Sequence, residues 1–156
     1  MERACVVRFG KVKSVGAVPA IERWSVMQPR RRAMTDDEVD TIEGQLGLTM
    51  PAEYRAFVCD PPAPFVKAYG GHELFMDPRF VINTTRGRRS ELIEVRMPYE
   101  LVVIGEPGNG DFTCLDLSQE PATVVEYDHE RGEFRTVAFS FDSWVSRLSR
   151  PLGGAA

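Results

Sequence analysis

The sequence predicts one α+β domain, in which a central, mostly antiparallel sheet is flanked by two helices that precede it and closed by a C-terminal helix. Three observations predict this class. Two capped, amphipathic segments follow each other between residues 34 and 60, four short apolar or β-branched segments lie between residues 101 and 139, and one more amphipathic segment follows them. A chain of 156 residues fits one domain, which we place at residues 34–150.

The first helix is predicted over residues 36–46. Thr35 and Glu38 form a capping box, in which the side chain of each residue reaches the backbone amide of the other. Gly47 is placed to end the helix in a left-handed conformation. The apolar side chains that share one helical face are Val39, Ile42 and Leu46.

A second helix is predicted to start at Pro51, because proline suits the first helical turn, where its missing amide would have no partner. The residues that give this helix a buried face are Tyr54, Phe57 and Val58. Further along, residues 72–76 favour a strand, and the Asp77-Pro78 pair predicts a short helix that reaches residue 83. Residues 84–89 are expected to form a polar, basic loop, and residues 90–96 fit either a helix or a strand.

The sheet is predicted from residue 101 onward. Residues 101–105 are a nearly continuous apolar segment, typical of a central strand, and an Asn-Gly turn follows them. The next segments with a strand pattern are 111–117, 122–127 and 134–139. Their close spacing predicts an antiparallel meander. Ser140 then caps the closing helix, whose apolar residues are Phe141, Trp144, Val145 and Leu148.

The two ends of the chain differ from this domain. Residues 1–33 carry eight basic residues against two acidic ones and show no sustained period, which predicts a basic extension that is irregular or contains short strands. Residues 151–156 are expected to be a disordered tail. Residues 34–156, by contrast, hold 21 acidic and 11 basic residues. That surplus argues against a nucleic-acid partner and favours a basic protein partner.

Sites for catalysis, metals or cofactors are not predicted. The cysteines Cys5, Cys59 and Cys114 are odd in number and widely spaced, which argues against a zinc site or a disulfide framework and favours the cytoplasm. The segment that begins at His129 lacks the second histidine of a zinc helix, and the turn at residues 106–110 lacks the Gly-Lys-Ser/Thr of a phosphate loop. No segment approaches the about 20 apolar residues that span a membrane.

Four blocks of residues, in this order, resemble the Smi/Knr-type family, also called the SUKH superfamily. The residues that carry the resemblance are Glu43, Gly47, Pro51, Tyr54 and Phe57, the Gly70-Gly71 turn, Gly105, Gly110 and Asp111 in the first hairpin, Val125 to Glu130, and Ser140, Phe141 and Trp144. The resemblance covers residues 34–149 and implies an α+β fold with helices around an antiparallel sheet.

The resemblance also implies a function that uses no catalytic residue. Bacterial members of the family look like immunity proteins that bind and neutralise a cognate toxin, often a nuclease or deaminase, whereas eukaryotic relatives act as scaffolding regulators of cell-wall synthesis. We expect a monomer or weak dimer that docks a basic toxin on an acidic surface made by Glu106, Asp111, Asp116, Glu126, Asp128 and Glu130. Two alternatives stay open: a scaffold that binds through apolar surface around residues 61–69, and a hydrolase centred on His129 or His72.

Overall fold

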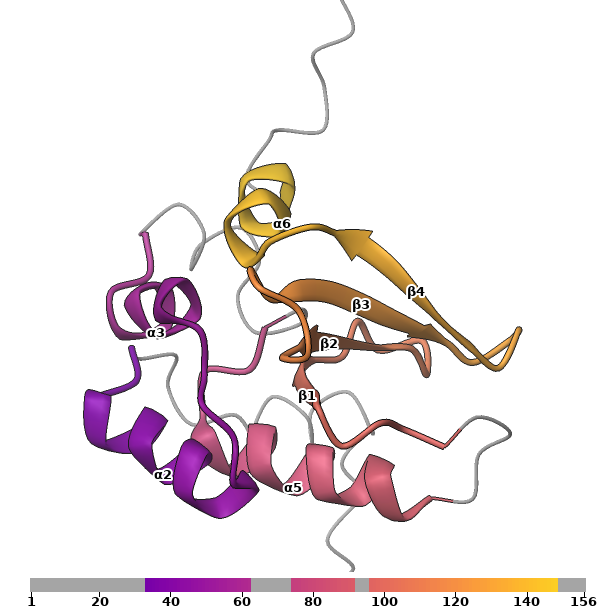
Figure 1. The fold of residues 1–156 in the computed structure, drawn as a ribbon, viewed down its shortest axis with the longest axis horizontal. Helices are drawn as coiled ribbons and strands as arrows, with labels where there is room; N and C mark the ends of the chain where they lie inside the picture. Colours follow the sequence, from indigo (N-terminus) through magenta and orange to yellow (C-terminus); the bar gives the residue numbers. More distant parts are fainter. Residues whose placement is uncertain (1–32, 63–73, 92–95, 149–156) are drawn as a thin grey trace, which may run out of the picture. The chain divides into compact units, whose positions relative to one another are not determined.

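Four helices and a four-stranded sheet make up the residues that this computed structural model describes, 33–62, 74–91 and 96–148 (Figure 1). The helices are α2 (Asp36–Leu46), α3 (Ala52–Cys59), α5 (Pro78–Ser90) and α6 (Phe141–Leu148). The strands are β1 (Leu101–Gly105), β2 (Phe112–Asp116), β3 (Thr123–Asp128) and β4 (Glu133–Ala138). The α+β class is therefore confirmed, and the third helix before the sheet, α5, is longer than the short helix that the sequence predicted there.

The strands lie side by side in chain order, and each neighbouring pair is antiparallel, as the meander prediction required. Phe112, the first residue of β2, lies opposite Tyr127 near the end of β3, and Asp128 lies opposite Glu133. The β1–β2 turn and the β3–β4 turn are consequently at the same end of the sheet, and the β2–β3 loop is at the other end.

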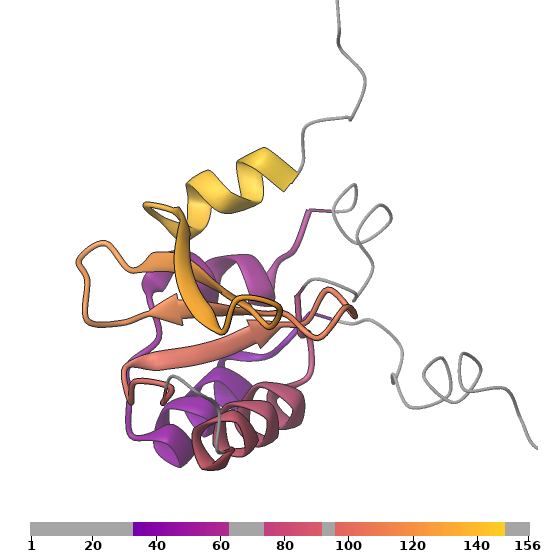
Figure 2. The ribbon, with the colours of Figure 1, turned by 90° about the vertical axis from the view of Figure 1, so that its right-hand side faces the viewer.

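One face of the sheet packs against the helices in the main core. The strand residues of this core are Val102, Ile104, Leu115, Val124 and Ala138, and the helices contribute among others Val39, Ile42, Tyr54, Val81 and Phe141. The rings of Tyr54 and Phe141 meet edge to face, with their centroids 5.4 Å apart. Figure 2 shows α2 and α5 together on the β1 side of the sheet and α6 on the β4 side.

The opposite face of the sheet carries a smaller cluster, because successive side chains of a strand alternate between faces. Its buried members are Met97, Leu101, Val103, Phe112, Cys114 and Tyr127. The rings of Phe112 and Tyr127 stack with their centroids 4.8 Å apart, and the Arg88 guanidinium of α5 lies 4.8 Å from the centroid of the Phe112 ring.

Helix α2 has the bounds and caps that the sequence predicted. The Thr35 hydroxyl accepts from the Glu38 amide (3.3 Å), and the Glu38 carboxylate accepts from the Thr35 amide (2.9 Å). Gly47 follows the helix with φ 68°, and its amide donates to the Glu43 carbonyl. A Cβ at Gly47 would lie 2.9 Å from the Tyr99 hydroxyl, which itself donates to the Leu46 carbonyl at 2.6 Å.

Helix α3 starts one residue later than predicted. Pro51 is the residue before its first turn, since its ψ of 143° is extended rather than helical. Tyr54 and Val58 are buried as expected, and Phe57 is partly buried against the same core. The predicted Gly70-Gly71 turn, the apolar surface at residues 63–69, His72, the basic extension over 1–32 and the tail at 151–156 lie outside the described residues.

The segment before the sheet corrects two predictions. Residues 74–76, the described part of the predicted strand at 72–76, are not a strand; Phe75 makes one backbone hydrogen bond, from its amide to the Ile104 carbonyl. The short helix predicted to reach residue 83 continues instead to Ser90 and includes the predicted loop at 84–89. The buried positions Val81, Ile82 and Thr85 explain this continuation, because they keep one helical face against the core.

Strand β1 is an edge strand and not the central strand that its apolar sequence suggested. Helix α5 covers its outer edge: the Val103 amide donates to the Thr85 hydroxyl at 2.9 Å, and Arg89 donates to the Leu101 carbonyl at 3.2 Å. Both faces of β1 are also buried, with Val102 and Ile104 in the main core and Leu101 and Val103 in the smaller cluster, which is why its sequence is apolar throughout.

Candidate functional site

The six acidic residues proposed from the sequence do not form one cluster. Glu106 and Asp111 bound the β1–β2 turn, and Asp128 and Glu130 bound the β3–β4 turn, which stands at the right-hand tip of the sheet in Figure 1. We call residues 106–111 and 128–132 together the turn end. The remaining two residues lie elsewhere: Asp116 ends β2 at the opposite end of the sheet, and Glu126 lies within β3, on the face opposite to Tyr127.

Asp111 and His129 join the two turns of the turn end. Asp111 Oδ1 accepts from the His129 backbone amide at 2.9 Å and lies 2.7 Å from Nδ1 of the same residue. The side chain of Asn109 supports this contact, since its Nδ2 donates to Asp111 Oδ2 and its Oδ1 accepts from the Asp111 amide. These hydrogen bonds lower the pKa of the Asp111 carboxyl and raise the pKa of the His129 imidazole.

Asp128 builds the β3–β4 turn. Its Oδ1 accepts from the backbone amides of Glu130 (3.0 Å) and Arg131 (3.1 Å), and the Arg131 Nε lies 3.8 Å from its Oδ2. Gly132 then takes the left-handed φ of 66° that lets the chain return into β4. The Glu130 side chain is exposed and has no hydrogen-bond or ion-pair partner among the described residues.

The other three carboxylates also have contacts within the protein. Glu106 lies 2.9 Å from Arg88 of α5, and Glu126 lies 3.3 Å from Arg135 of β4. Asp116 accepts from the backbone amide and the hydroxyl of Ser118, at 2.9 and 2.6 Å. Of the six predicted residues, Glu130 is therefore the one whose carboxylate is both exposed and unengaged within the described part of the chain.

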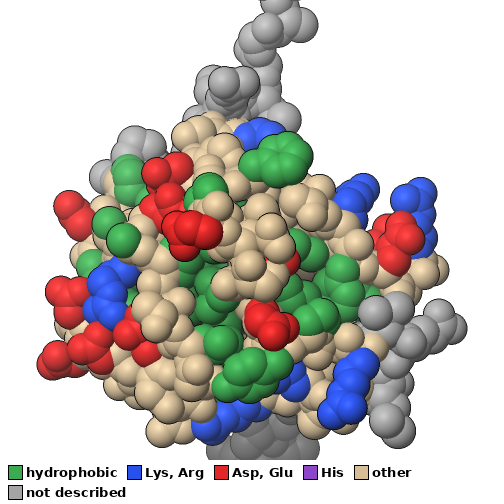
Figure 3. Space-filling model, in the orientation of Figure 1, with side chains coloured by type: hydrophobic (Ala, Val, Ile, Leu, Met, Phe, Trp, Pro, Cys, Tyr) green, Lys and Arg blue, Asp and Glu red, His purple; other side chains and the backbone are tan. Residues whose placement is uncertain are grey.

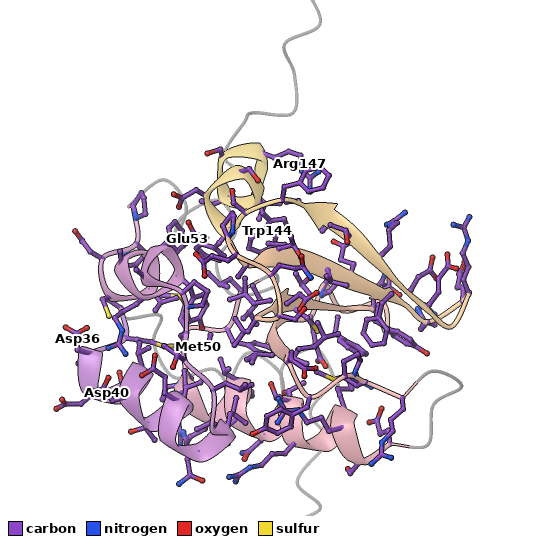
Figure 4. All side chains as sticks on the ribbon, in the orientation of Figure 1. Asp36, Asp40, Met50, Glu53, Trp144 and Arg147 are labelled. Atoms are coloured by element: carbon purple, nitrogen blue, oxygen red, sulfur yellow. The ribbon has the colours of Figure 1, made fainter. Side chains whose placement is uncertain are left out.

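A second acidic region lies on α2. In the sequence, its acidic residues served only to predict the start of a helix. Residues 36–60 hold seven acidic residues and a single basic one, Arg55. The side chains of Asp36 and Asp40 are 75% and 62% exposed. Figure 3 shows red side chains around a blue one at the left of the molecule, where Figure 4 labels Asp36 and Asp40. The exposed members of this α2 acidic face are Asp36, Asp37 and Asp40.

Arg55 connects this acidic face to α3. Its guanidinium lies 3.3 Å from Asp36, 2.8 Å from Asp40 and 3.1 Å from Glu43. These carboxylates, Asp40 most of all, raise the pKa of the Arg55 guanidinium. The spacing of the Asp-Asp-Glu-Val-Asp run was the signal for this surface, because residues 36, 40 and 43 fall on one side of a helix.

The residues that carried the family resemblance have structural roles. Glu43 Oε1 accepts from the Met50 amide at 2.8 Å, which holds the link between α2 and α3. Gly105 is buried and follows the irregularity in the β1–β2 register. A Cβ at Gly110, whose φ is 99°, would lie 3.2 Å from the His129 ring. Trp144 is buried in the main core beside Phe141, with their ring centroids 5.9 Å apart.

Groups that could catalyse a reaction or bind a metal are considered for residues 33–62, 74–91 and 96–148, the ranges that the structure describes. Within these ranges no three His, Cys, Asp or Glu side chains are placed to hold a metal ion, and no hydroxyl or thiol is hydrogen-bonded to His129. Cys114 is fully buried, which raises the pKa of its thiol, and partial burial raises the pKa of the Cys59 thiol. None of the helices in these ranges is long and apolar enough to cross a membrane.

Comparison with protein-family models gave one finding. Residues 33–147 match the SMI1 / KNR4 family (SUKH-1), so the match includes every helix and strand described above except the last residue of α6. Comparisons with curated proteins and with solved structures gave no match. Because the matched segment is most of the chain, this protein belongs to the SMI1/KNR4 (SUKH-1) family.

Proposed function

We propose that this protein is an immunity protein, which binds a cognate toxin of nuclease or deaminase type and neutralises it without catalysing a reaction. The observation that carries the proposal is the family membership over residues 33–147, since that family fits an immunity-type binding domain. The acidic surplus supports it too. A toxin that acts on nucleic acid is basic, and an acidic protein meets such a partner faster and can occupy its phosphate-binding cleft.

The docking surface that we propose is the acidic one predicted from the sequence: Glu106, Asp111, Asp116, Glu126, Asp128 and Glu130. Four of these residues lie at the turn end, and there Glu130 offers the most accessible carboxylate. In this arrangement Asp111 and Asp128 fix the shape of the two turns through their own hydrogen bonds, while Glu130 meets the partner directly. Asp116 and Glu126 contribute through the field of the surface rather than through a shared contact patch.

The proposal predicts that a toxin module is encoded beside this gene, and the test is a neutralisation assay with that module. We expect equimolar protein to abolish the toxin's activity and the affinity to fall as salt is raised. His129→Ala separates binding from catalysis, because a binding mechanism predicts inhibition that stays stoichiometric, with a changed affinity but without turnover of any substrate. A toxin that stays fully active in the presence of excess protein contradicts the proposal.

The cytoplasm is the proposed location, in keeping with the free thiols of Cys59 and Cys114. We place the protein there as a monomer or weak dimer, which size-exclusion chromatography with light scattering checks. A protein that elutes as a stable dimer at nanomolar concentration contradicts this part of the proposal.

The alternative function, a scaffold that binds a cellular protein through apolar surface, is favoured by one feature. Phe139, between β4 and α6, is 82% exposed, and Tyr99 is 54% exposed. Exposed aromatic side chains are common anchors of protein interfaces. The two functions differ in their salt dependence, since an apolar interface centred on Phe139 keeps its affinity at high salt whereas the acidic surface does not.

A further inference from the structure

The contact between Asp111 and His129 connects two turns that are 18 residues apart in the chain. Two donors of one residue converge on one oxygen: the backbone amide of His129 at 2.9 Å and its ring Nδ1 at 2.7 Å. A carboxylate accepts but does not donate, so the ring must present its Nδ1–H toward Asp111. The short distance is typical of a hydrogen bond between charged groups.

The turn around Gly110 is shaped to receive the imidazole. Gly110 has φ 99°, and an added Cβ would lie within 3.2–3.4 Å of three atoms of the His129 ring. The ring therefore lies directly against the backbone of the β1–β2 turn. A change in the position or charge of the ring must be felt by the Gly110 backbone, because no side chain separates them.

Three carboxylates raise the pKa of His129, and Arg131, on the same turn, contacts Asp128. Asp111 contacts His129 from the β1–β2 turn, and Asp128 and Glu130 lie near it on its own turn. Together they favour the protonated ring, with the hydrogen bond to Asp111 as the main cause of its raised pKa. Histidine is the side chain whose charge changes most readily near neutral pH, so the charge of this contact depends on pH.

We propose that His129 is a proton-dependent tie between the β1–β2 and β3–β4 turns, so that the charge and the local order of the turn end change together as pH rises. When the ring is protonated, an ion-paired hydrogen bond to Asp111 holds the two turns against each other. When the ring is neutral, the hydrogen bond is weaker and the turn end carries one more net negative charge.

The way in which the strength of the tie depends on pH follows from the pKa shifts of His129 and Asp111. His129 has a raised pKa in the folded protein, so its contribution to the tie is complete at low pH and is lost as pH rises through that raised value. Asp111 has a lowered pKa, so its contribution is present at neutral pH and is lost as pH falls through that lowered value. The tie is strongest in the window between the two.

The inference extends to regulation of toxin binding, and that extension rests on the proposed function. A turn end that becomes more negative as pH rises attracts a basic partner more strongly, so the association rate should increase with pH. In His129→Gln the ring proton is absent, and the association rate should no longer depend on pH in this range.

The experiment on the free protein is a pH titration followed by NMR. We expect the His129 ring signals and the backbone amide signals of Gly108, Gly110 and Asp111 to shift with one common midpoint. Asp111→Asn should move the ring midpoint down toward the ordinary histidine value, whereas Asp142→Asn, a control on exposed surface of α6, should leave it unchanged. In His129→Gln the amide shifts with that midpoint should disappear.

Two results overturn the tie. One is a set of amide signals at residues 108–111 that stay constant while the ring titrates, and the other is a ring midpoint that Asp111→Asn does not change. Far-UV circular dichroism of each variant checks that it is folded. The titration contains no toxin, so its result is independent of the proposed function. A toxin that fails to bind at any pH contradicts the proposed function but does not affect the conclusion about the tie.

Discussion

The two acidic regions of this protein use their carboxylates in different ways. At the turn end, Asp111 and Asp128 accept hydrogen bonds from the backbone amides of the turns themselves. On the α2 acidic face, Asp36 and Asp40 are more than half exposed and share one cation, Arg55. The difference teaches that the number of acidic residues in a segment does not measure the negative charge available to a partner. Some carboxylates accept hydrogen bonds from backbone amides of the protein's own turns and are engaged there.

The largest effect on stability is expected at the C-terminal end of α2, the helix that carries the α2 acidic face. Gly47→Ala places a Cβ at a φ of 68° and 2.9 Å from the Tyr99 hydroxyl, which holds the Leu46 carbonyl. Strain of this kind costs about 1–3 kcal/mol, and loss of the Tyr99 hydrogen bond adds to it. Urea denaturation measures the change in the free energy of unfolding.

Gly44→Ala is the matched control for this prediction. Gly44 lies inside α2, and an added Cβ there meets nothing within 4 Å. Because alanine favours a helix over glycine, this variant should be more stable by up to about 1 kcal/mol. Equal destabilisation by both substitutions would show that the left-handed end of α2 is not the cause.

The next effect separates the partly buried carboxylate of Glu43 from the exposed one of Asp40. Glu43→Ala removes the acceptor of the Met50 amide as well as one partner of Arg55, so we expect a loss of about 1.5–3 kcal/mol. Asp40→Ala removes only an exposed partner of Arg55, and its cost should be below about 1 kcal/mol. Denaturation curves of the two variants measure this difference, and similar losses would mean that the ion pairs, not the Met50 contact, matter.

At the turn end, stability should depend on pH through Asp111. Wild type should exceed Asp111→Asn in melting temperature most at mildly acidic pH, between the ordinary pKa values of a carboxyl and an imidazole, where the two shifts keep Asp111 ionised and His129 protonated. The difference should shrink above the raised pKa of His129 and again below the lowered pKa of Asp111. Thermal unfolding across this range measures it, and a difference that is constant with pH contradicts the charged contact.

The sequence predicted some elements accurately because their signals are local. Thr35, Glu38 and Gly47 define both ends of α2 within the helix and its flanking residues. The second half of α5 has no such signal. Its helical state depends on Thr85 meeting Val103 and on Arg88 meeting Glu106, each 18 residues away, and the local sequence of polar and basic residues is typical of a loop.

The candidate site was predicted in part for the same reason. Asp111 comes just before β2 and His129 just after β3, so their meeting follows from the register that sets Phe112 opposite Tyr127. The antiparallel pairing of the strands at 111–117 and 122–127 could therefore have predicted this contact from the sequence. The engagement of Glu106 by Arg88 could not be foreseen, because it required the full length of α5. The exposure of Asp36 and Asp40 was also missed, since the capping signal explained the same residues.

The smallest free-energy effect is expected from charge reversal at accessible carboxylates, and it decides which acidic region meets the partner. Glu130 at the turn end and Asp37 on α2 are both exposed, and neither side chain has a hydrogen-bond or ion-pair partner among the described residues. Glu130→Lys should therefore leave the melting temperature close to wild type, whereas Asp37→Lys, which puts a positive charge in the first turn of α2, should cost about 1 kcal/mol. If the turn end docks the toxin, Glu130→Lys should slow association by roughly two- to five-fold at low salt, because charges at the rim of an interface act mainly on the association rate. Asp37→Lys should have a weaker effect that salt reduces further, since exposed charges outside the interface act only through the solvent and are screened. Stopped-flow mixing with the toxin measures both rates, and a larger loss in Asp37→Lys would move the docking surface from the turn end to the α2 acidic face.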